Sequence, residues 1–282
     1  MMNNINKYLL IFPLLLWLVL FLVLPYIFIL TQSVLATDDF GKVVYDLNFD
    51  SYIKIFTNPL YYETLIRTFI YAIIVALVCI VLSLPLAYFI AFKVTKNKSF
   101  YYTLIVLPFW MSYIVRAYAW KLILGENGIF NSSLMNLGII DKPLRFVLYS
   151  DFSVILCLIY IFLPFVCIPI YTSFEQISKS LVEASKDLGA NSWETFTKVI
   201  FPLILPGVIS GGTLALVLTL GDFLAASLLG GPNTLFISSI VQNLFGTSND
   251  KPLGSAVGVV LLILVFMVLE LSSRYEKKHE TQ

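Results

Sequence analysis

Six long apolar runs constrain this chain more than any other feature. A helix needs about 20 mostly apolar residues to cross a lipid bilayer, and each run reaches or approaches that length. No run carries Asp, Glu, Lys or Arg near its middle. We therefore predict an all-α membrane protein with six transmembrane helices. The runs are Tyr8–Leu30, Thr68–Phe92, Phe100–Val115, Ser153–Phe174, Val199–Gly221 and Gly254–Leu271.

The composition agrees with lipid as the main partner of the chain. Hydrophobic residues make up 59% of the sequence and charged residues 12%, whereas soluble domains contain about 45–50% apolar and about 25% charged residues. The formal net charge is only +1. A nucleic-acid partner is not expected, because such proteins present a strongly basic surface.

The first apolar run has two interpretations. It could be a secretory signal that ends near Val34-Leu35-Ala36. A signal core has about 7–15 apolar residues, whereas Tyr8–Leu30 has 23. We expect this segment to be retained as a membrane anchor.

The distribution of Lys and Arg predicts the orientation. Ten of the 18 basic residues fall in segments 1–7, 93–99, 175–198 and 272–282. These segments together are less than half as long as the segments on the other side of the membrane. Because short cytoplasmic loops are enriched in Lys and Arg, we predict that both termini lie in the cytoplasm. The expected location is the bacterial inner membrane, with multiple passes.

Catalytic and metal-binding residues are scarce. Cys79, Cys157 and Cys167 all lie inside apolar runs, and the single histidine lies in the charged C-terminal tail. The sequence has no phosphate-binding G-x-x-x-x-G-K-[ST] stretch. We expect no enzyme activity, no metal and no cofactor in this chain.

Segment 175–198, which we call the polar insert, interrupts the apolar pattern between the fourth and fifth runs. Ser180–Glu183 (SLVE) and Asn191–Glu194 (NSWE) both have the form of a capping box, and Gly189 is suited to a left-handed helix stop. We predict a short helix, a glycine turn, and a second helix that continues into the fifth span past Pro202. The alternative is a simple amphipathic connector at the lipid headgroups.

The spacing within this insert resembles the EAA motif of ABC importer permeases. That motif reads E-A-A, three residues, G, nine residues, then I-x-L-P. Here Glu183-Ala184-Ser185 is followed by Gly189 and then by Val199-Ile200-Phe201-Pro202. The chain departs from the motif at Ser185, Val199 and Phe201, all by small or apolar exchanges. The resemblance implies the type I (MetI-like) permease fold, with residues 1–282 as a single permease domain.

In this family the insert couples the permease to a separate cytoplasmic ATPase dimer. The resemblance implies that Glu183 supplies a polar anchor, that Ala184 and Ser185 allow close approach, and that Gly189 makes the turn. Pro202 belongs to the link that carries motion into the fifth span. Trp193 and Phe196 are our candidates for packing against the ATPase, although either could lie on the bilayer instead.

The chain also resembles the B-type permease subunits of bacterial spermidine/putrescine importers over nearly its full length. The implied substrate is a polyamine, and the alternative is iron, phosphonate or another small solute. The implied partners are a second, homologous permease in a heterodimer and a periplasmic substrate-binding protein that contacts loops 31–67 and 116–152. The residues that carry the resemblance are Leu107–Trp110, Val115–Tyr118, Gly125–Gly128, Leu137–Asp141, Ile161–Phe165, Gly221–Phe223 and Leu229–Pro232.

A polyamine favours carboxylates and aromatic faces, for ion pairing and for cation–π contact. Asp222 closes the fifth run at the outer face, where an acid is costly unless it faces water or a partner. Trp110, Tyr113 and Tyr118 lie near the outer end of the third run. These four residues are our candidates for the substrate path. The alternatives are an interfacial aromatic belt and a structural role for Asp222, and nearby Arg116 would repel a polycation.

Two other classes of protein remain as rivals. A secondary transporter or channel usually places ionisable residues or paired broken helices at mid-membrane, and the six runs lack such charges. A membrane enzyme would need an acid–base or metal set that the sequence does not offer.

Overall fold

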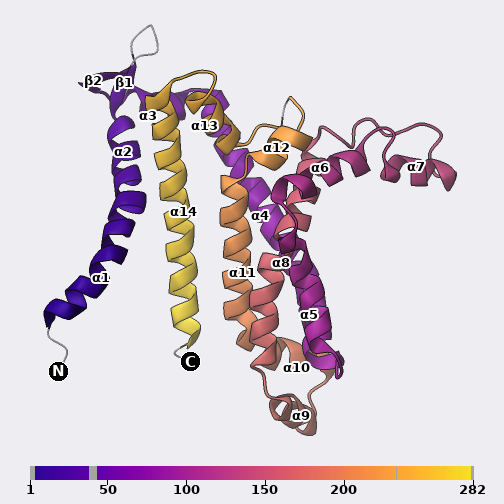
Figure 1. The fold of residues 1–282 in the computed structure, drawn as a ribbon. Coiled ribbons are helices and arrows are strands. Elements are labelled where there is room, and N and C mark those ends of the chain that lie inside the picture. The colour runs from indigo at the N-terminus through magenta and orange to yellow at the C-terminus, as the bar shows by residue number, and fades with distance from the viewer. Residues whose placement is uncertain (1–3, 38–42, 233, 281–282) are drawn as a thin grey trace. The chain divides into compact units, whose positions relative to one another are not determined.

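The computed structural model describes residues 4–37, 43–232 and 234–280. Residues 1–3 and 281–282, at the two termini that we predict to be cytoplasmic, lie outside these ranges. The described chain is mostly helical (Figure 1). It divides into two compact units, one formed by the described residues of Met1–Glu63 and Ile240–Leu264, the other by those of Thr64–Ser239 and Val265–Gln282. The predicted helical membrane fold is confirmed.

The first unit begins with a long apolar helix made of α1 (Asn4–Leu18), the π-turn η1 (Val19–Val23) and α2 (Leu24–Gln32). The predicted span Tyr8–Leu30 lies within it. A small antiparallel sheet follows, with β1 (Leu35–Thr37) paired to β2 (Val43–Leu47), and then α3 (Asp50–Thr57). The Tyr52 hydroxyl donates to Ser33 Oγ at 2.8 Å.

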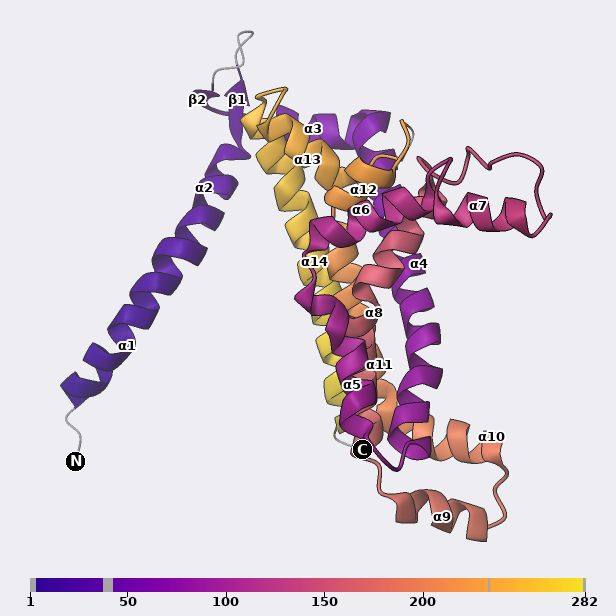
Figure 2. The ribbon, with the colours of Figure 1, turned by 45° about the vertical axis from the view of Figure 1, so that its right-hand side comes forward.

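The second unit holds most of the remaining helices. The elements that follow α3 in the chain are α4 (Pro59–Tyr88), η2 (Phe89–Lys93), α5 (Lys98–Val106), η3 (Leu107–Trp110), α6 (Tyr113–Leu124), α7 (Ile129–Asn136), α8 (Asp151–Glu175), α9 (Lys179–Asp187), α10 (Ser192–Thr195), η4 (Phe196–Ile200), α11 (Phe201–Gly221), α12 (Leu224–Leu229), α13 (Ile237–Phe245) and α14 (Lys251–Glu280). Within this unit, α9 and α10 lie at one end, and α6 and α12 lie at the opposite end (Figures 1 and 2).

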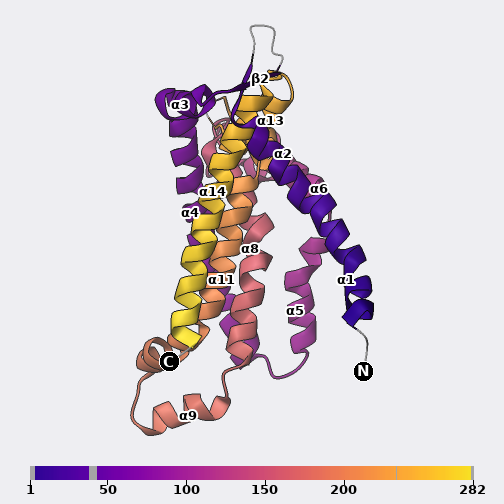
Figure 3. The ribbon, with the colours of Figure 1, turned by 90° about the vertical axis from the view of Figure 1, so that its left-hand side faces the viewer.

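Helix α8 forms the centre of the second unit, and α11 packs along it (Figure 3). Cys157, Leu158 and Ile170 of α8 are fully buried, and Cys79 and Cys167 are also buried. A Cβ atom at Gly207 of α11 would lie 2.6 Å from the carbonyl oxygen of Pro169. Glycine therefore allows the two helices to approach closely, as small residues do in membrane bundles.

The third predicted span, Phe100–Val115, is bent rather than one continuous helix, and its crossing of the membrane stays a prediction. Helix α5 tightens into the 3₁₀ turn η3, Met111 and Ser112 are extended, and α6 leaves at an angle of 92°. Pro108 has no N–H to donate to the preceding turn, which weakens the helix at this place. Among the described residues, five helices are long and apolar enough to span a membrane, or six if the bent pair counts as one.

The other predicted spans lie inside longer helices. The sixth, Gly254–Leu271, is the apolar part of α14, which is 30 residues long. The fifth, Val199–Gly221, lies within one helical run from Ser192 to Gly221. The predicted continuity between the polar insert and the fifth span is therefore confirmed.

Candidate functional site

The polar insert folds as a helix, a left-handed turn and a second helix. Gly189 has a φ of +86°, which glycine adopts without strain. Its N–H donates to the carbonyl of Lys186 at 2.8 Å, and the N–H of Ala190 donates to the carbonyl of Ser185 at 3.1 Å. These two bonds satisfy carbonyls at the end of α9. The predicted glycine stop is confirmed.

Of the two predicted capping boxes, only the second forms. The Asn191 side chain accepts from the Glu194 N–H at 2.9 Å, and the Glu194 carboxylate accepts from the Asn191 N–H at 3.1 Å. Lys198 forms an ion pair with Glu194 at 3.0 Å. These contacts fix the start of the helical run that leads into α11.

The first capping box, at Ser180–Glu183, was a wrong prediction. Helix α9 begins at Lys179, and its N-cap is Ser178, which makes no side-chain cap bond. The buried Ile177 holds the chain close to the core, and the Leu181 N–H already donates to the Ser178 carbonyl at 3.2 Å. Ser180 is therefore inside the first turn, and Glu183 stands further along the helix than expected.

A hydrogen bond between side chains connects α9 with α10. The Ser185 and Thr195 hydroxyls lie 3.0 Å apart. Ser185 donates its only hydrogen to the Val182 carbonyl at 2.8 Å, so Thr195 must be the donor to Ser185. Thr195 is only 3% exposed. The sequence reasoning missed this bond, although Ser185 was noted as a departure from the family pattern.

The surface of the insert is open. Glu183, Ala184 and Gly189 are exposed, and in the described part of the chain the Glu183 carboxylate makes no hydrogen bond or ion pair. Trp193 is 71% exposed and Leu188 is 89% exposed. Leu188 was missed by the sequence analysis; the signal for it is an apolar residue placed directly before the stop glycine.

Phe196 and Pro202 lie where the insert enters the apolar helix. Phe196 is half-buried, and its ring centroid lies 6.2 Å from that of Trp193. Pro202 is the second residue of α11 and follows the π-turn η4. Proline has no N–H to donate to the preceding turn, and this accounts locally for the wider turn at η4.

At the opposite end of the second unit, Asp222 joins several helices. Its carboxylate accepts the Tyr113 hydroxyl of α6 and the Ala225 N–H of α12 at 2.9 Å. Its backbone carbonyl accepts the Ser238 hydroxyl of α13. Asp222 is 8% exposed. The acid is therefore enclosed and hydrogen-bonded at the place where α11 ends.

Arg116 is buried one turn after Tyr113. It is 7% exposed, and its Nε and Nη1 atoms have no hydrogen-bond partner among the described residues. Its guanidinium carbon lies 5.9 Å from the centroid of the Tyr113 ring. In the described part of the chain no Asp or Glu side chain forms an ion pair with Arg116.

The four candidates for the substrate path do not form one cluster. Tyr113 and Asp222 meet, whereas Trp110 and Tyr118 are exposed, and among the described residues no hydrogen bond joins either of them to that pair. Lys121 lies 6.0 Å from the Tyr118 ring centroid. Within the described ranges, no group of three or more His, Cys, Asp or Glu residues could hold a metal ion.

Comparisons with known proteins agree on one class. The family model "Binding-protein-dependent transport system inner membrane component" matches residues 63–275. The chain is 38% identical over 255 residues to the spermidine/putrescine transport system permease protein PotB of Escherichia coli K12, covering 90% of this chain and 91% of the relative. The PotB protein of Haemophilus influenzae is 33% identical over 261 residues, covering 93% and 91%.

Among solved structures, the fold is similar to a chain of a bacterial alginate ABC transporter, crystallised in complex with a periplasmic protein bound to an alginate pentasaccharide. The TM-score is 0.78 with 21% sequence identity, covering 97% of this chain and 96% of that one. At this identity the likeness supports the fold alone.

Proposed function

Because the chain belongs to the family of inner membrane components of binding-protein-dependent transport systems, we propose that it is a permease subunit of an ATP-driven importer of polyamines such as spermidine and putrescine. The observation that carries the substrate is the identity of 38% to a spermidine/putrescine permease over nine-tenths of the chain. Residues 1–282 act as one permease domain and form half of a pore. A homologous permease supplies the other half, in a heterodimer.

The polar insert is the contact for a cytoplasmic ATPase dimer. Its exposed carboxylate at Glu183 and the small residue Ala184 leave room for a close partner. Leu188 and Trp193 add exposed apolar surface on either side of the glycine turn. The helical run from Ser192 to Gly221 supplies a stiff connection into the membrane. Movement of the ATPase would thus reach α11 directly.

This role requires the insert and both termini to lie in the cytoplasm, as the distribution of basic residues predicts. The opposite end of the second unit then faces the periplasm, where a substrate-binding protein delivers the solute. Trp110 and Tyr118 are exposed there and offer aromatic faces to an incoming cation.

Asp222 and Tyr113 form a contact that the solute has to open. In this structure the hydroxyl of Tyr113 occupies the carboxylate, so an ammonium group reaches Asp222 only after α6 moves. We assign to this pair the role of a closed contact on the path, and the single carboxylate supplies the charge that a polyamine recognises.

The test is uptake of radiolabelled spermidine and putrescine by proteoliposomes that contain the assembled importer and its binding protein. We expect uptake that depends on ATP and on the binding protein, with no uptake of phosphonate or ferric iron. ATP-dependent uptake of one of those solutes, with no polyamine uptake, would refute the proposed substrate and leave the permease assignment intact.

A further inference from the structure

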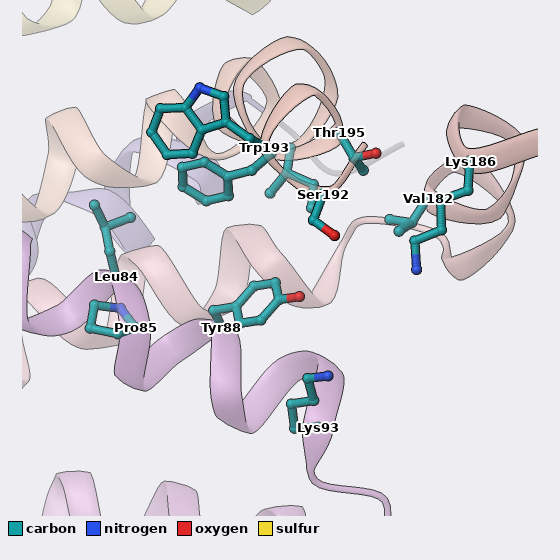
Figure 4. Close-up of a pocket in the computed structure, with 11 residues that line it drawn as sticks. Leu84, Pro85, Tyr88, Lys93, Val182, Lys186, Ser192, Trp193 and Thr195 are labelled. Atoms are coloured by element: carbon teal, nitrogen blue, oxygen red, sulfur yellow. The ribbon is translucent and has the colours of Figure 1, made fainter. Parts of the chain in front are cut away.

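A groove of about 470 Å³ separates the polar insert from the end of α4 (Figure 4). One wall comes from the end of α4 and from η2, and the other comes from α9, α10 and η4. All of the residues that line the groove belong to the second unit. The lining residues are Leu84, Pro85, Tyr88, Lys93, Val182, Lys186, Ser192, Trp193, Thr195, Phe196 and Ile200.

The groove has two chemically different parts. Leu84 and Pro85 of α4 and Phe196 of η4 line its apolar part. In Figure 4 the ammonium groups of Lys93 and Lys186 and the hydroxyl of Tyr88 turn toward the same space. A second hollow of about 230 Å³ shares Tyr88, Lys93 and Lys186 and adds Lys179.

The positive charge at the basic end of the groove is not neutralised within the described part of the chain, where the ammonium groups of Lys93, Lys179 and Lys186 make no ion pair or hydrogen bond. Two nearby acids are already engaged, since Glu175 pairs with Lys98 at 3.6 Å and Glu194 pairs with Lys198 at 3.0 Å. Glu183 lines only the second hollow. Three lysines against one acid favour an anionic ligand.

The apolar part of the groove distinguishes between the possible anionic ligands. Leu84 lies nine residues before Lys93 in one candidate span, so the groove extends roughly 13 Å along the helix from the basic end toward the hydrocarbon. A free phosphate or the surface of a water-soluble protein would leave the apolar part of the groove unfilled. An anionic phospholipid matches both parts, with its phosphate at the lysines and its first methylene groups along the apolar part.

We propose that this groove binds an anionic phospholipid of the cytoplasmic leaflet, such as phosphatidylglycerol. This inference rests on the proposed orientation of the insert. Because the lipid would lie between η2 and α9, it would connect the ATPase-binding insert to the second span. The lipid composition of the inner leaflet would then influence how ATP hydrolysis is coupled to transport.

The test compares lipid binding by the assembled importer and by variants. The complex is purified from membranes of phosphatidylcholine with added phosphatidylglycerol, and bound phosphatidylglycerol is quantified by native mass spectrometry. We expect the double variant Lys93→Gln/Lys186→Gln to weaken binding about 25-fold, at about fivefold for each lysine. The matched control is Lys96→Gln, an exposed lysine that lies outside the groove. It should bind as the wild type does, and Lys93→Arg/Lys186→Arg should retain most of the binding.

Three results would overturn the proposal. Equal retention of phosphatidylglycerol by the Gln double variant and the wild type would exclude a site at these lysines. Displacement of the lipid by inorganic phosphate alone would identify a phosphate site. Binding by the isolated permease that disappears when the ATPase associates would show that the ATPase fills the groove. Polyamine uptake is measured on the same preparations, so a failure of the proposed function is seen separately as absent uptake in every lipid mixture.

Discussion

Replacing Ser185 with alanine gives the sharpest test of how the polar insert is held together. Ser185 accepts the hydrogen bond of the Thr195 hydroxyl across the glycine turn. Alanine is the residue that the EAA pattern has at this position, so the change leaves the rest of the motif intact. It removes the one side-chain hydrogen bond between α9 and α10 that the described residues provide.

The magnitude follows from the burial of Thr195. A buried hydroxyl that loses its partner costs about 1–3 kcal/mol, and Thr195 is 3% exposed. We expect α9 to separate from α10 more easily, by about 1–2 kcal/mol of local opening free energy. Because 1.4 kcal/mol corresponds to about a factor of ten, amide protection in α9 should fall by about 5- to 30-fold.

Hydrogen–deuterium exchange of the assembled importer measures this directly, and transport per ATP hydrolysed measures its consequence. Thr195→Val is the matched partner, since it removes the hydroxyl that would be left without a partner. The double variant Ser185→Ala/Thr195→Val should exchange more slowly than Ser185→Ala alone, because no unsatisfied buried hydroxyl remains. Unchanged exchange in Ser185→Ala, with full additivity in the double variant, would refute the reasoning.

Three further predictions concern the same architecture. Glu183→Lys should reduce uptake to background while the permease remains in the membrane, and co-purification of the ATPase should fall; normal uptake would contradict the assigned contact. Asp222→Asn should reduce polyamine uptake more than basal ATP hydrolysis, and Tyr113→Phe should reduce uptake less, since it leaves the carboxylate charge in place; equal losses of uptake and hydrolysis in Asp222→Asn would remove Asp222 from the path. Gly207→Ala should destabilise the packing of α8 on α11 by about 1–3 kcal/mol through overpacking, seen as a lower melting temperature in detergent, whereas an unchanged melting temperature would mean that the helices separate without cost.

Much of the fold follows from local sequence patterns. Lipid requires long, uncharged helices, so the apolar runs predict where the spans lie. The turn at Gly189 and the capping box at Asn191–Glu194 depend on residues a few positions apart. Two serines, Ser178 and Ser180, precede or begin α9. The local pattern predicted Ser180 as the N-cap, whereas the N-cap in the structure is Ser178.

The tertiary structure decided what distant segments do together. Tyr113 and Asp222 are 109 residues apart and meet where α6, after its bend from α5, lies against the end of α11. Lys93 and Lys186 share one groove because the end of α4 lies opposite α9. Side-chain contacts of this kind depend on how helices pack and where they bend, and hydrophobic length carries no information about either. The sequence by itself therefore determined the membrane-spanning class and the polar insert, while packing determined which side chains meet.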